Sequence, residues 1–375
     1  MTVKTALLTL GRLPKALELT RGLHRAGVRV IVAEPFGWHV CRPSRSVDLC
    51  VALPAPNVDP EGYADALCNT IERENVDLVI PVSEEAIHAL NVRERVSASF
   101  YSPDRDIILR LHDKLHFSRT ARALGLSVPP TYPVDTDEAR LLVRNSAVIV
   151  KPSHGCSGVG VEKFDRFTTL PKMPGGIAQT FIRGRHVSTF SVAHEGRTRV
   201  TAMYEGTLMS GTVAVCFRRV RELPAVENWV REFIERQSLS GFMSFDFIVD
   251  DDGTAWAIEC NPRVTSGIHF LRADDLACAV LNPDATDDIR FREQEHFGQF
   301  YPALTETYKY FFEPSEFARH FRTLWNANDV VFDRTDPLPF FMMTPASWPI
   351  LRQTIFQGRS FGEAATHDIA WQGTD

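Results

Sequence analysis

The sequence predicts an α/β fold in which a parallel sheet comes first and antiparallel strands follow. Residues 3–10 and 28–34 are apolar runs typical of buried strands, and residues 14–26 between them have the apolar spacing of a helix. A strand, a helix and a strand within about 35 residues form a βαβ unit, and therefore a parallel sheet. Another strand of this sheet is expected at 77–82.

The pattern changes in the middle of the chain. Residues 107–130 predict a helix with Lys114 near its start, and 147–152 and 176–184 predict strands. Residues 187–206 then alternate between apolar and polar side chains around a His-Glu-Gly turn, which is typical of an antiparallel hairpin. We therefore expect a domain boundary near the start of the predicted helix.

Composition and charge narrow the classes of function. The 375 residues carry 41 Lys and Arg against 47 Asp and Glu, a net charge of −6, which argues against a general nucleic-acid binder because such proteins carry a basic excess. No apolar run approaches the roughly 20 residues of a membrane span, and the N-terminus does not resemble a signal peptide. The seven cysteines are scattered and form no CxxC pair, so we expect reduced thiols and a cytoplasmic protein.

A glycine-rich loop with a lysine in front of it follows one of the predicted strands. In VIVKPSHGCSGVGV, residues 148–161, Lys151 precedes Gly155, Gly158 and Gly160. Glycines let backbone N–H groups converge on an anion, and such nests bind phosphate. A Walker loop would end in Gly-Lys-Ser/Thr, and the spacing here is the reverse of the dinucleotide motif. The loop therefore predicts a phosphate site of another kind.

The N-terminal sheet raises a second hypothesis, NAD binding. Glu34 follows Gly11 at about the 20-residue distance of an acidic residue that binds ribose. The turn supplies one glycine where the dinucleotide motif needs three, so an NAD-dependent dehydrogenase is kept as a lesser alternative.

An acidic hairpin is expected at 242–263, FMSFDFIVDDDGTAWAIECNPR. Two alternating strands flank an Asp-Gly pair, which predicts a two-residue turn. With that turn, Asp246 faces Glu259 directly and Asn261 lies on the same face of the sheet. An odd-length turn would shift this register.

Two carboxylates and an amide oxygen on one sheet face indicate a metal site, since like charges opposed across a ladder repel each other. Oxygen-only ligands favour Mg²⁺, with Mn²⁺ as an alternative, over zinc. One or two ions are expected, and a solvated sheet face is the competing interpretation. The opposite face is expected to belong to the core, through Phe245, Phe247, Trp256 and Ile258.

These features together resemble the ATP-grasp superfamily, in particular its carbamoyl-phosphate-synthetase and biotin-carboxylase-like branch. The resemblance covers roughly residues 110–270, from Asp113-Lys114 through the glycine loop and AQTFIRG to the IECNPR end of the hairpin. The combination of the Lys-Pro glycine loop with the acidic hairpin carries the resemblance, because each motif alone is weak.

The resemblance implies an ATP-grasp fold with a defined layout. A Rossmann-like pre-ATP-grasp domain would span 1–108, an ATP-grasp domain 109–284, and an extension of undetermined role 285–375. Within the ATP-grasp domain, a small mobile lid would cover about 115–183, and a mainly antiparallel C-terminal subdomain would carry the metal hairpin.

The resemblance also implies roles for single residues. Lys114 and Lys151 would hold the phosphates of ATP, and the three oxygen ligands of the hairpin would hold magnesium. Arg263 would be catalytic and stabilise the charge of the transferred phosphoryl group. The other ATP-binding residues would come from the glycine loop, which acts as a flap, from the hinge at Gln179 to Ile182, and from the residues just after it. They are Gly155, Ser157, Gly158, Gly160, Gln179, Phe181, Ile182 and His186.

The chain departs from the family pattern in two places. Gly184-Arg185-His186 follows the hinge, where related proteins often carry a glutamate for the ribose, so His186 is only a candidate for that contact. No Met-Lys-Met biotinylation signal is present, so a complete biotin carboxylase is not expected.

The function implied is an ATP-dependent ligase. It would activate a carboxylate, or an enolised ketone, by phosphorylation and couple it to an amine such as an amino acid, releasing ADP and phosphate in a specialised biosynthesis. Small-molecule substrates would be its partners, without nucleic acid or membrane, and a homodimer is left open. A non-catalytic nucleotide-binding protein of the same fold is the alternative. The presence of Asp246, Glu259, Asn261 and Arg263 together argues against it, because a sensor needs no arginine for a transition state.

The tail after residue 285 lies outside these motifs. Ser315 is expected to cap a helix with one apolar face, which we expect to be packed. That face consists of Phe317, Phe321, Leu324 and Trp325. A further strand and turn are expected at 328–341.

Overall fold

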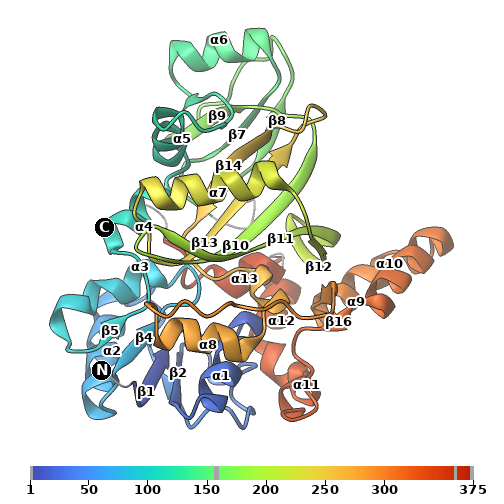
Figure 1. The fold of residues 1–375 in the computed structure, drawn as a ribbon. Coiled ribbons are helices and arrows are strands. Elements are labelled where there is room, and N and C mark those ends of the chain that lie inside the picture. The colour runs from blue at the N-terminus through green and yellow to red at the C-terminus, as the bar shows by residue number, and fades with distance from the viewer. Residues whose placement is uncertain (1–2, 156–159, 359–360, 372–375) are drawn as a thin grey trace. The chain divides into compact units, whose positions relative to one another are not determined.

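The computed structural model describes residues 3–155, 160–358 and 361–371. Its contacts divide the chain into two compact units. The first comprises Met1–Ser102, Tyr204–Val220 and Arg263–Ala370, and the second comprises Pro103–Met203, Arg221–Pro262 and Trp371–Asp375. The mixture of one parallel sheet with antiparallel strands confirms the predicted α/β class (Figure 1).

A parallel sheet forms the centre of the first unit, as the βαβ pattern predicts. Its strand order is β3-β2-β1-β4-β5, and every paired neighbour runs parallel. The strands are β1 (Thr5–Leu8), β2 (Arg29–Glu34), β3 (Leu49–Ala52), β4 (Leu78–Ile80) and β5 (Ser99–Phe100). The helices between them are α1 (Pro14–Arg25), α2 (Pro60–Arg73), α3 (Ala86–Ala89) and a 3-10 helix at Leu90–Arg95.

The later segments of the first unit add further helices and three strands that pair with one another. Helix α1 packs against α8 (Figure 1). The elements are β12 (Val213–Val220), a 3-10 helix at Ser266–Phe270, α8 (Ala273–Leu281), β15 (His296–Gly298), α9 (Phe300–Lys309), α10 (Pro314–Asn326), β16 (Asn328–Asp329), α11 (Leu338–Phe341), α12 (Met343–Gln357) and α13 (Phe361–Thr366).

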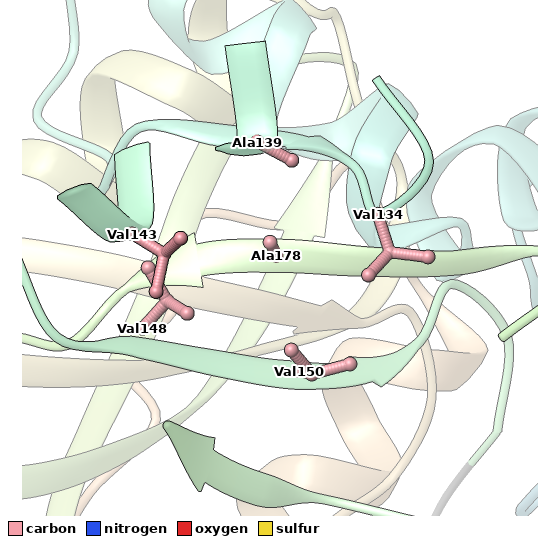
Figure 2. Close-up of a cluster of buried hydrophobic side chains, with 6 residues drawn as sticks. All are labelled: Val134, Ala139, Val143, Val148, Val150 and Ala178. Atoms are coloured by element: carbon pink, nitrogen blue, oxygen red, sulfur yellow. The ribbon is translucent and has the colours of Figure 1, made fainter. Parts of the chain in front are cut away.

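The second unit begins with two helices and a small sheet of order β6-β9-β7-β8. Helix α6 covers this sheet, and six small apolar side chains fill the space between them (Figure 2). The elements are α4 (Arg105–His112), α5 (Lys114–Ala123), β6 (Thr131–Pro133), α6 (Asp137–Asn145), β7 (Val148–Pro152), β8 (Glu162–Phe164) and β9 (Gly176–Thr180). The packed side chains are Val134, Ala139, Val143, Val148, Val150 and Ala178.

A larger antiparallel sheet completes the second unit in the order β14-β13-β10-β11. Its strands are β10 (Arg185–His194), β11 (Arg197–Ser210, whose last residues belong to the first unit), β13 (Gly241–Val249) and β14 (Ala255–Asn261). Helix α7 (Pro224–Arg236) lies across this sheet (Figure 1). Trp229 stacks on Phe233 of the same helix at 5.1 Å and meets Phe245 of β13 edge-on at 5.4 Å. This aromatic core holds the hairpin that carries the acidic residues.

Two expectations for the tail are wrong. Helix α10 begins at Pro314, so Ser315 lies inside its first turn and is not the cap, because proline at the first helical position fixes the backbone one residue earlier. Residues 328–341 form only the two-residue β16 and the short α11 instead of a longer strand. Within the described part of the chain, no helix is long and apolar enough to cross a bilayer.

Candidate active site

Two buried lysines of the second unit lie next to the acidic hairpin. Lys151 in β7 and Lys114 at the start of α5 are 5% and 7% exposed. Nζ of Lys151 donates to the carbonyl of Ile258 at 3.3 Å, and Nζ of Lys114 lies 3.6 Å from Oε2 of Glu259. Burial lowers the pKa of Lys151 to about 8, and the positive charge of neighbouring Lys114 lowers it further. The negative charge of Glu259 acts in the opposite direction but does not outweigh burial. Two close, desolvated cations favour a bound anion.

A helix cap fixes the position of Lys114. The predicted helix at 107–130 is broken at Asp113, whose extended backbone ends α4 and whose carboxylate begins α5. Its Oδ1 accepts the backbone N–H groups of Leu115 and His116 at 2.8 and 3.1 Å, and the hydroxyl of Ser153 donates to the same oxygen at 2.5 Å. The backbone N–H of Lys114 also donates to the carbonyl of Ser153 at 3.0 Å. The cap thus joins the first turn of α5 to the end of β7.

The glycine loop begins beside these lysines. Nζ of Lys114 donates to the carbonyl of Gly155 at 2.8 Å. Gly155 has a φ of +128°, which side chains with a Cβ rarely adopt, so glycine is needed for this bond. Gly160 also has a positive φ. The predicted contacts Ser157 and Gly158 lie outside the described residues.

The acidic hairpin has the predicted pairing at its functional end. Asp246 of β13 pairs with Glu259 of β14, and Ser244 pairs with Asn261. The two carboxylates therefore lie opposite each other, with the amide of Asn261 on the same face.

The turn that produces this register differs from the prediction. Beyond Asp246 the register shifts, so that Phe247 pairs with Ala257 and Ile258 is the extra residue of a β-bulge. The backbone N–H of Asp250 donates to the carbonyl of Thr254, which leaves an odd number of residues in the turn. The odd turn and the bulge compensate for each other. The bulge also turns Ile258 out of the regular ladder, and its carbonyl accepts the bond from Lys151.

The predicted core face of the hairpin is half right. Phe245 and Phe247 are fully buried, whereas Trp256 and Ile258 are only half-buried. The bulge causes this, because a one-residue shift moves later side chains to the other face. The indole N–H of Trp256 instead donates to the carboxylate of Asp250 at 2.7 Å.

The donor set fits a hard divalent cation. The amide Nδ2 of Asn261 donates to Asp246 Oδ2 at 3.1 Å and to Glu259 Oε1 at 3.2 Å, so the three side chains converge. Turning this amide by 180° exchanges Nδ2 for Oδ1 and presents three oxygens, the ligands that Mg²⁺ prefers. The set thus consists of two carboxylates and one amide. Among the described residues, no cluster of three or more His, Cys, Asp or Glu side chains suited to a metal ion is present. The hydroxyl of Ser188 donates to the other oxygen of Asp246 at 2.5 Å and orients that carboxylate.

Glu259 is held in its ionised form. Burial alone would raise its pKa, but the charges of Lys114 and Lys151, together with the hydrogen bond donated by the Asn261 amide, hold the pKa of Glu259 well below its usual value of 4.5. An ionised carboxylate offers only acceptor oxygens, which is the state that binds a metal.

The predicted hinge lies at the end of β9. Phe181 is 38% exposed, and Nζ of Lys163 lies 4.4 Å from the centre of its ring. Gln179 is buried, and its Nε2 donates to the hydroxyl of Thr131 at 3.0 Å, so its side chain anchors β9 to β6. Ile182 is half-buried.

His186 follows the hinge in β10, two residues before Ser188. Its side chain is exposed, and it pairs in register with Ile248 of β13. The carboxylate of Glu259 is near enough to act on its ring electrostatically. His186 therefore lies in the neighbourhood of the hairpin acids.

Arg263 belongs to the first unit, two positions after Asn261 in the chain. Its guanidinium Nη2 lies 2.7 Å from Oε1 of Glu84, whose side chain is only 2% exposed. Glu84 follows β4, at the carboxyl end of the parallel sheet. A buried carboxylate therefore fixes the position of the predicted catalytic arginine.

Sequence reasoning missed the residues that support the predicted ones. Asp113 and Ser153 orient Lys114, Ser188 orients Asp246, and Glu84 orients Arg263. A cap signal existed for Asp113, since aspartate commonly precedes a helix. The other contacts join distant parts of the chain and leave no local pattern.

Glu34, the acidic residue on which the hypothesis of NAD binding depends, is occupied by contacts within the protein. The carboxylate of Glu34 accepts the backbone N–H groups of Gly11 and Arg12, each at 2.9 Å, and that of Phe36 at 3.0 Å. It also forms an ion pair with the buried guanidinium of Arg12. Glu34 thus closes its own loop, and this contact accounts for the spacing to Gly11.

Comparison with protein families assigns the region that contains the lysines and the hairpin. The family described as the ATP-grasp domain matches residues 111–267. The chain contains an ATP-grasp domain. The matched residues include both lysines, the glycine loop, the hinge and the acidic hairpin. The match confirms the resemblance seen in the sequence. No curated protein sequence matches the chain.

Solved structures extend the likeness of the fold beyond the ATP-grasp domain. A biotin carboxylase from Campylobacter jejuni in complex with β-γ-ATP is 16% identical, with a TM-score of 0.65 over 78% of this chain and 74% of that one. An L-amino acid ligase from Bacillus licheniformis is also 16% identical, with a TM-score of 0.62 over 78% of each chain. The biotin carboxylase domain of the 2-oxoglutarate carboxylase from Hydrogenobacter thermophilus, solved with MgADP and bicarbonate, is 14% identical, with a TM-score of 0.62 over 78% of this chain and 71% of that one. At these identities the likeness is one of fold.

Proposed function

We propose that this protein is an ATP-dependent ligase that couples a carboxylate to an amine. The observation that carries the proposal is the convergence of Lys114 and Lys151 on the face where Asp246, Glu259 and Asn261 meet. Phosphoryl transfer needs positioning and charge neutralisation more than covalent help from the protein. Buried cations beside oxygen ligands for Mg²⁺ supply both.

The proposed reaction has two steps. An oxygen of the substrate carboxylate attacks the γ-phosphorus of ATP, the bond to the β–γ bridging oxygen breaks, and ADP leaves. The amine nitrogen then attacks the acyl carbon, the bond to the phosphate oxygen breaks, phosphate leaves, and the amine loses a proton. An enolised ketone in place of the carboxylate would be phosphorylated in the same first step.

Each group of the site has a role in this scheme. Lys114 and Lys151 bind the phosphates, while Phe181 and Ile182 at the hinge line the adenine pocket. Asp246, Glu259 and Asn261 hold one or two magnesium ions, which neutralise charge on the β- and γ-phosphates when bound. Arg263, held by Glu84, neutralises charge on the acyl-phosphate. The nucleotide bound in two of the compared structures, with magnesium named in one of them, supports this assignment.

A screen for phosphate release tests the proposal. The protein is incubated with ATP, Mg²⁺ and pairs of carboxylates and amines, and ADP, AMP, phosphate and pyrophosphate are measured separately. We expect ADP and phosphate only in the presence of both substrates, with an amide product. Release of AMP and pyrophosphate would exclude an acyl-phosphate. Nucleotide binding without turnover on any pair would favour the alternative, a non-catalytic nucleotide-binding protein.

A further inference from the structure

Helix α10 carries a row of aromatic side chains. Phe317, Phe321 and Trp325 follow one another at intervals of four residues, and their neighbouring rings stack with centroids 6.1 and 6.0 Å apart. Phe311 and Tyr308 extend the row beyond Phe317, with centroids 5.9 and 6.4 Å from that ring. The row thus runs from the end of α9 along α10.

The expectation that this face is packed is only partly right. Leu324 packs on a buried cluster that contains Leu208, Val215 and Ala303, so the inner side of α10 is held in place. The outer side is exposed. The exposed aromatic residues are Tyr308 at 57%, Phe311 at 57%, Phe312 at 92%, Phe321 at 46% and Trp325 at 78%.

The exposed area is large for a surface without a partner. Since an aromatic side chain buries roughly 150–250 Å² in a contact, these five expose about 650 Å² together. That approaches the roughly 800 Å² that each partner contributes to a standard interface, and it exceeds the few hundred Å² of an ordinary surface patch. The composition agrees, because aromatic residues are enriched in interfaces.

The spacing of the row indicates which partner covers it. Phe321 lies in the middle, with one aromatic residue four positions before it and another four positions after it. A twofold axis through Phe321 would set two α10 helices antiparallel, with Phe321 on Phe321 and Phe317 on Trp325 of the second copy. A twofold interface requires such a self-complementary patch, and antiparallel helices also oppose their dipoles favourably.

We propose that the outer face of α10, extended by Tyr308, Phe311 and Phe312, is the interface of a twofold-symmetric homodimer. The inference is independent of the catalytic proposal, since none of these residues belongs to the candidate active site. It makes Phe321 and Trp325 the central residues of the contact.

Light scattering during size-exclusion chromatography tests the proposal over a concentration series. The full chain is expected at twice the chain mass, and Phe321→Glu and Trp325→Glu at the chain mass. Trp38→Glu is the matched control, because Trp38 is also exposed, at 47%, but lies on the loop after β2; it should stay dimeric. A cooperative thermal transition shows that each variant is folded, even where loss of the dimer lowers its midpoint. A monomeric wild type, or a dimer that survives Trp325→Glu, overturns the proposal.

Crosslinking tests the symmetry separately. The exposed Cys278 is first changed to serine. Phe321→Cys should then crosslink to itself through a short bismaleimide, whereas Pro314→Cys, seven positions from the axis, should not. Crosslinking of both variants, or of neither, contradicts the antiparallel arrangement. Binding of a monomeric wild type to lipid vesicles would identify a membrane as the occupant and would also overturn the proposal.

Discussion

Asp246 and Glu259 are register partners on neighbouring strands, and the amide of Asn261 donates to both carboxylates at 3.1 and 3.2 Å. Two carboxylates opposed across a ladder destabilise a sheet. Here Lys114 and Lys151 offset part of that charge and keep Glu259 ionised. The arrangement favours a divalent cation.

Lys151→Ala should weaken ATP binding without unfolding the protein. Removing a buried cation that faces phosphate should lower ATP affinity at least tenfold, or about 1.4 kcal/mol. The thermal midpoint should change little, because the desolvation that lowers the pKa of Lys151 is relieved as well. Calorimetric titration with ATP measures the effect, and Lys172→Ala, an exposed lysine, is the control. A collapse of the midpoint with intact ATP affinity would show that Lys151 is structural.

Asp113→Ala should affect both stability and ATP binding. Loss of the cap on α5 should cost about 1 kcal/mol of unfolding free energy. It also removes the acceptor of Ser153, so Lys114 is no longer held and the KM for ATP should rise. Asp113→Asn keeps a capping oxygen and should recover most of the stability. Equal effects of the two variants on stability would contradict the capping role.

Glu84→Gln should lower turnover while leaving nucleotide binding intact. The amide keeps the size of the side chain but removes the charge that positions Arg263. We expect kcat to fall at least tenfold, while the thermal shift caused by Mg·ATP stays unchanged. Glu94 is exposed, so Glu94→Gln is the control and should match the wild type. In an Arg263→Ala background, Glu84→Gln should have no further effect on kcat. Additive losses would mean that Glu84 does not act through Arg263.

The buried cluster of Glu18, His269 and Arg292 should make stability depend on pH. Burial opposes ionisation of Glu18, but the charge of Arg292 and the hydrogen bond to His269 outweigh it and lower the pKa of Glu18 from 4.5. Its contribution is therefore complete above about pH 4.5 and lost as the pH falls further. Burial also lowers the pKa of His269 from 6.5, so protonation of the unfolded chain lowers stability below about pH 6.5.

Thermal midpoints of the wild type and Glu18→Gln at pH 7.5, 6 and 4 check this prediction. At pH 7.5 the free energy of unfolding of the variant should be lower by about 3 kcal/mol. This is the lower end of the cost of breaking a buried ion pair, because Arg292 is 31% exposed and so is partly solvated. The difference should shrink at pH 4, because Glu18 of the unfolded wild-type chain takes up a proton there before Glu18 of the folded protein does. A difference that grows toward pH 4 would contradict the assigned shift.

The sequence predicted those parts of the fold that depend on local patterns. Apolar runs located β1, β2 and β4, and the alternation around the Asp-Gly pair located β13 and β14. The bulge at Ile258 could not be predicted, because it depends on the fit between the hairpin and Lys151, more than 100 residues earlier. The pairing of Asp246 with Glu259 was nevertheless correct, since the bulge compensates for the odd turn.

The supporting residues of the site depend on long-range packing. Glu84 and Arg263 are far apart in the chain, and neither is part of a pattern that includes the other. On the outer face of α10, by contrast, a local pattern was present but did not distinguish between two kinds of contact. Its apolar spacing predicted packing, but Phe321 and Trp325 are exposed, because the same spacing serves a core and an interface equally well.

The thermal stability of Glu259→Gln with and without Mg·ATP tests the metal site, the central claim, most directly. Glutamine keeps the size of the side chain and removes one charge from the set. Without magnesium, the midpoint should fall slightly, because losing the attraction of Lys114 and Lys151 outweighs the relief of repulsion with Asp246. With Mg·ATP, the variant should lose both its activity and the extra stabilisation that ligand binding gives the wild type by mass action. A variant that equals the wild type in activity and in the shift by Mg·ATP would contradict the metal site, and with it the proposed ligase.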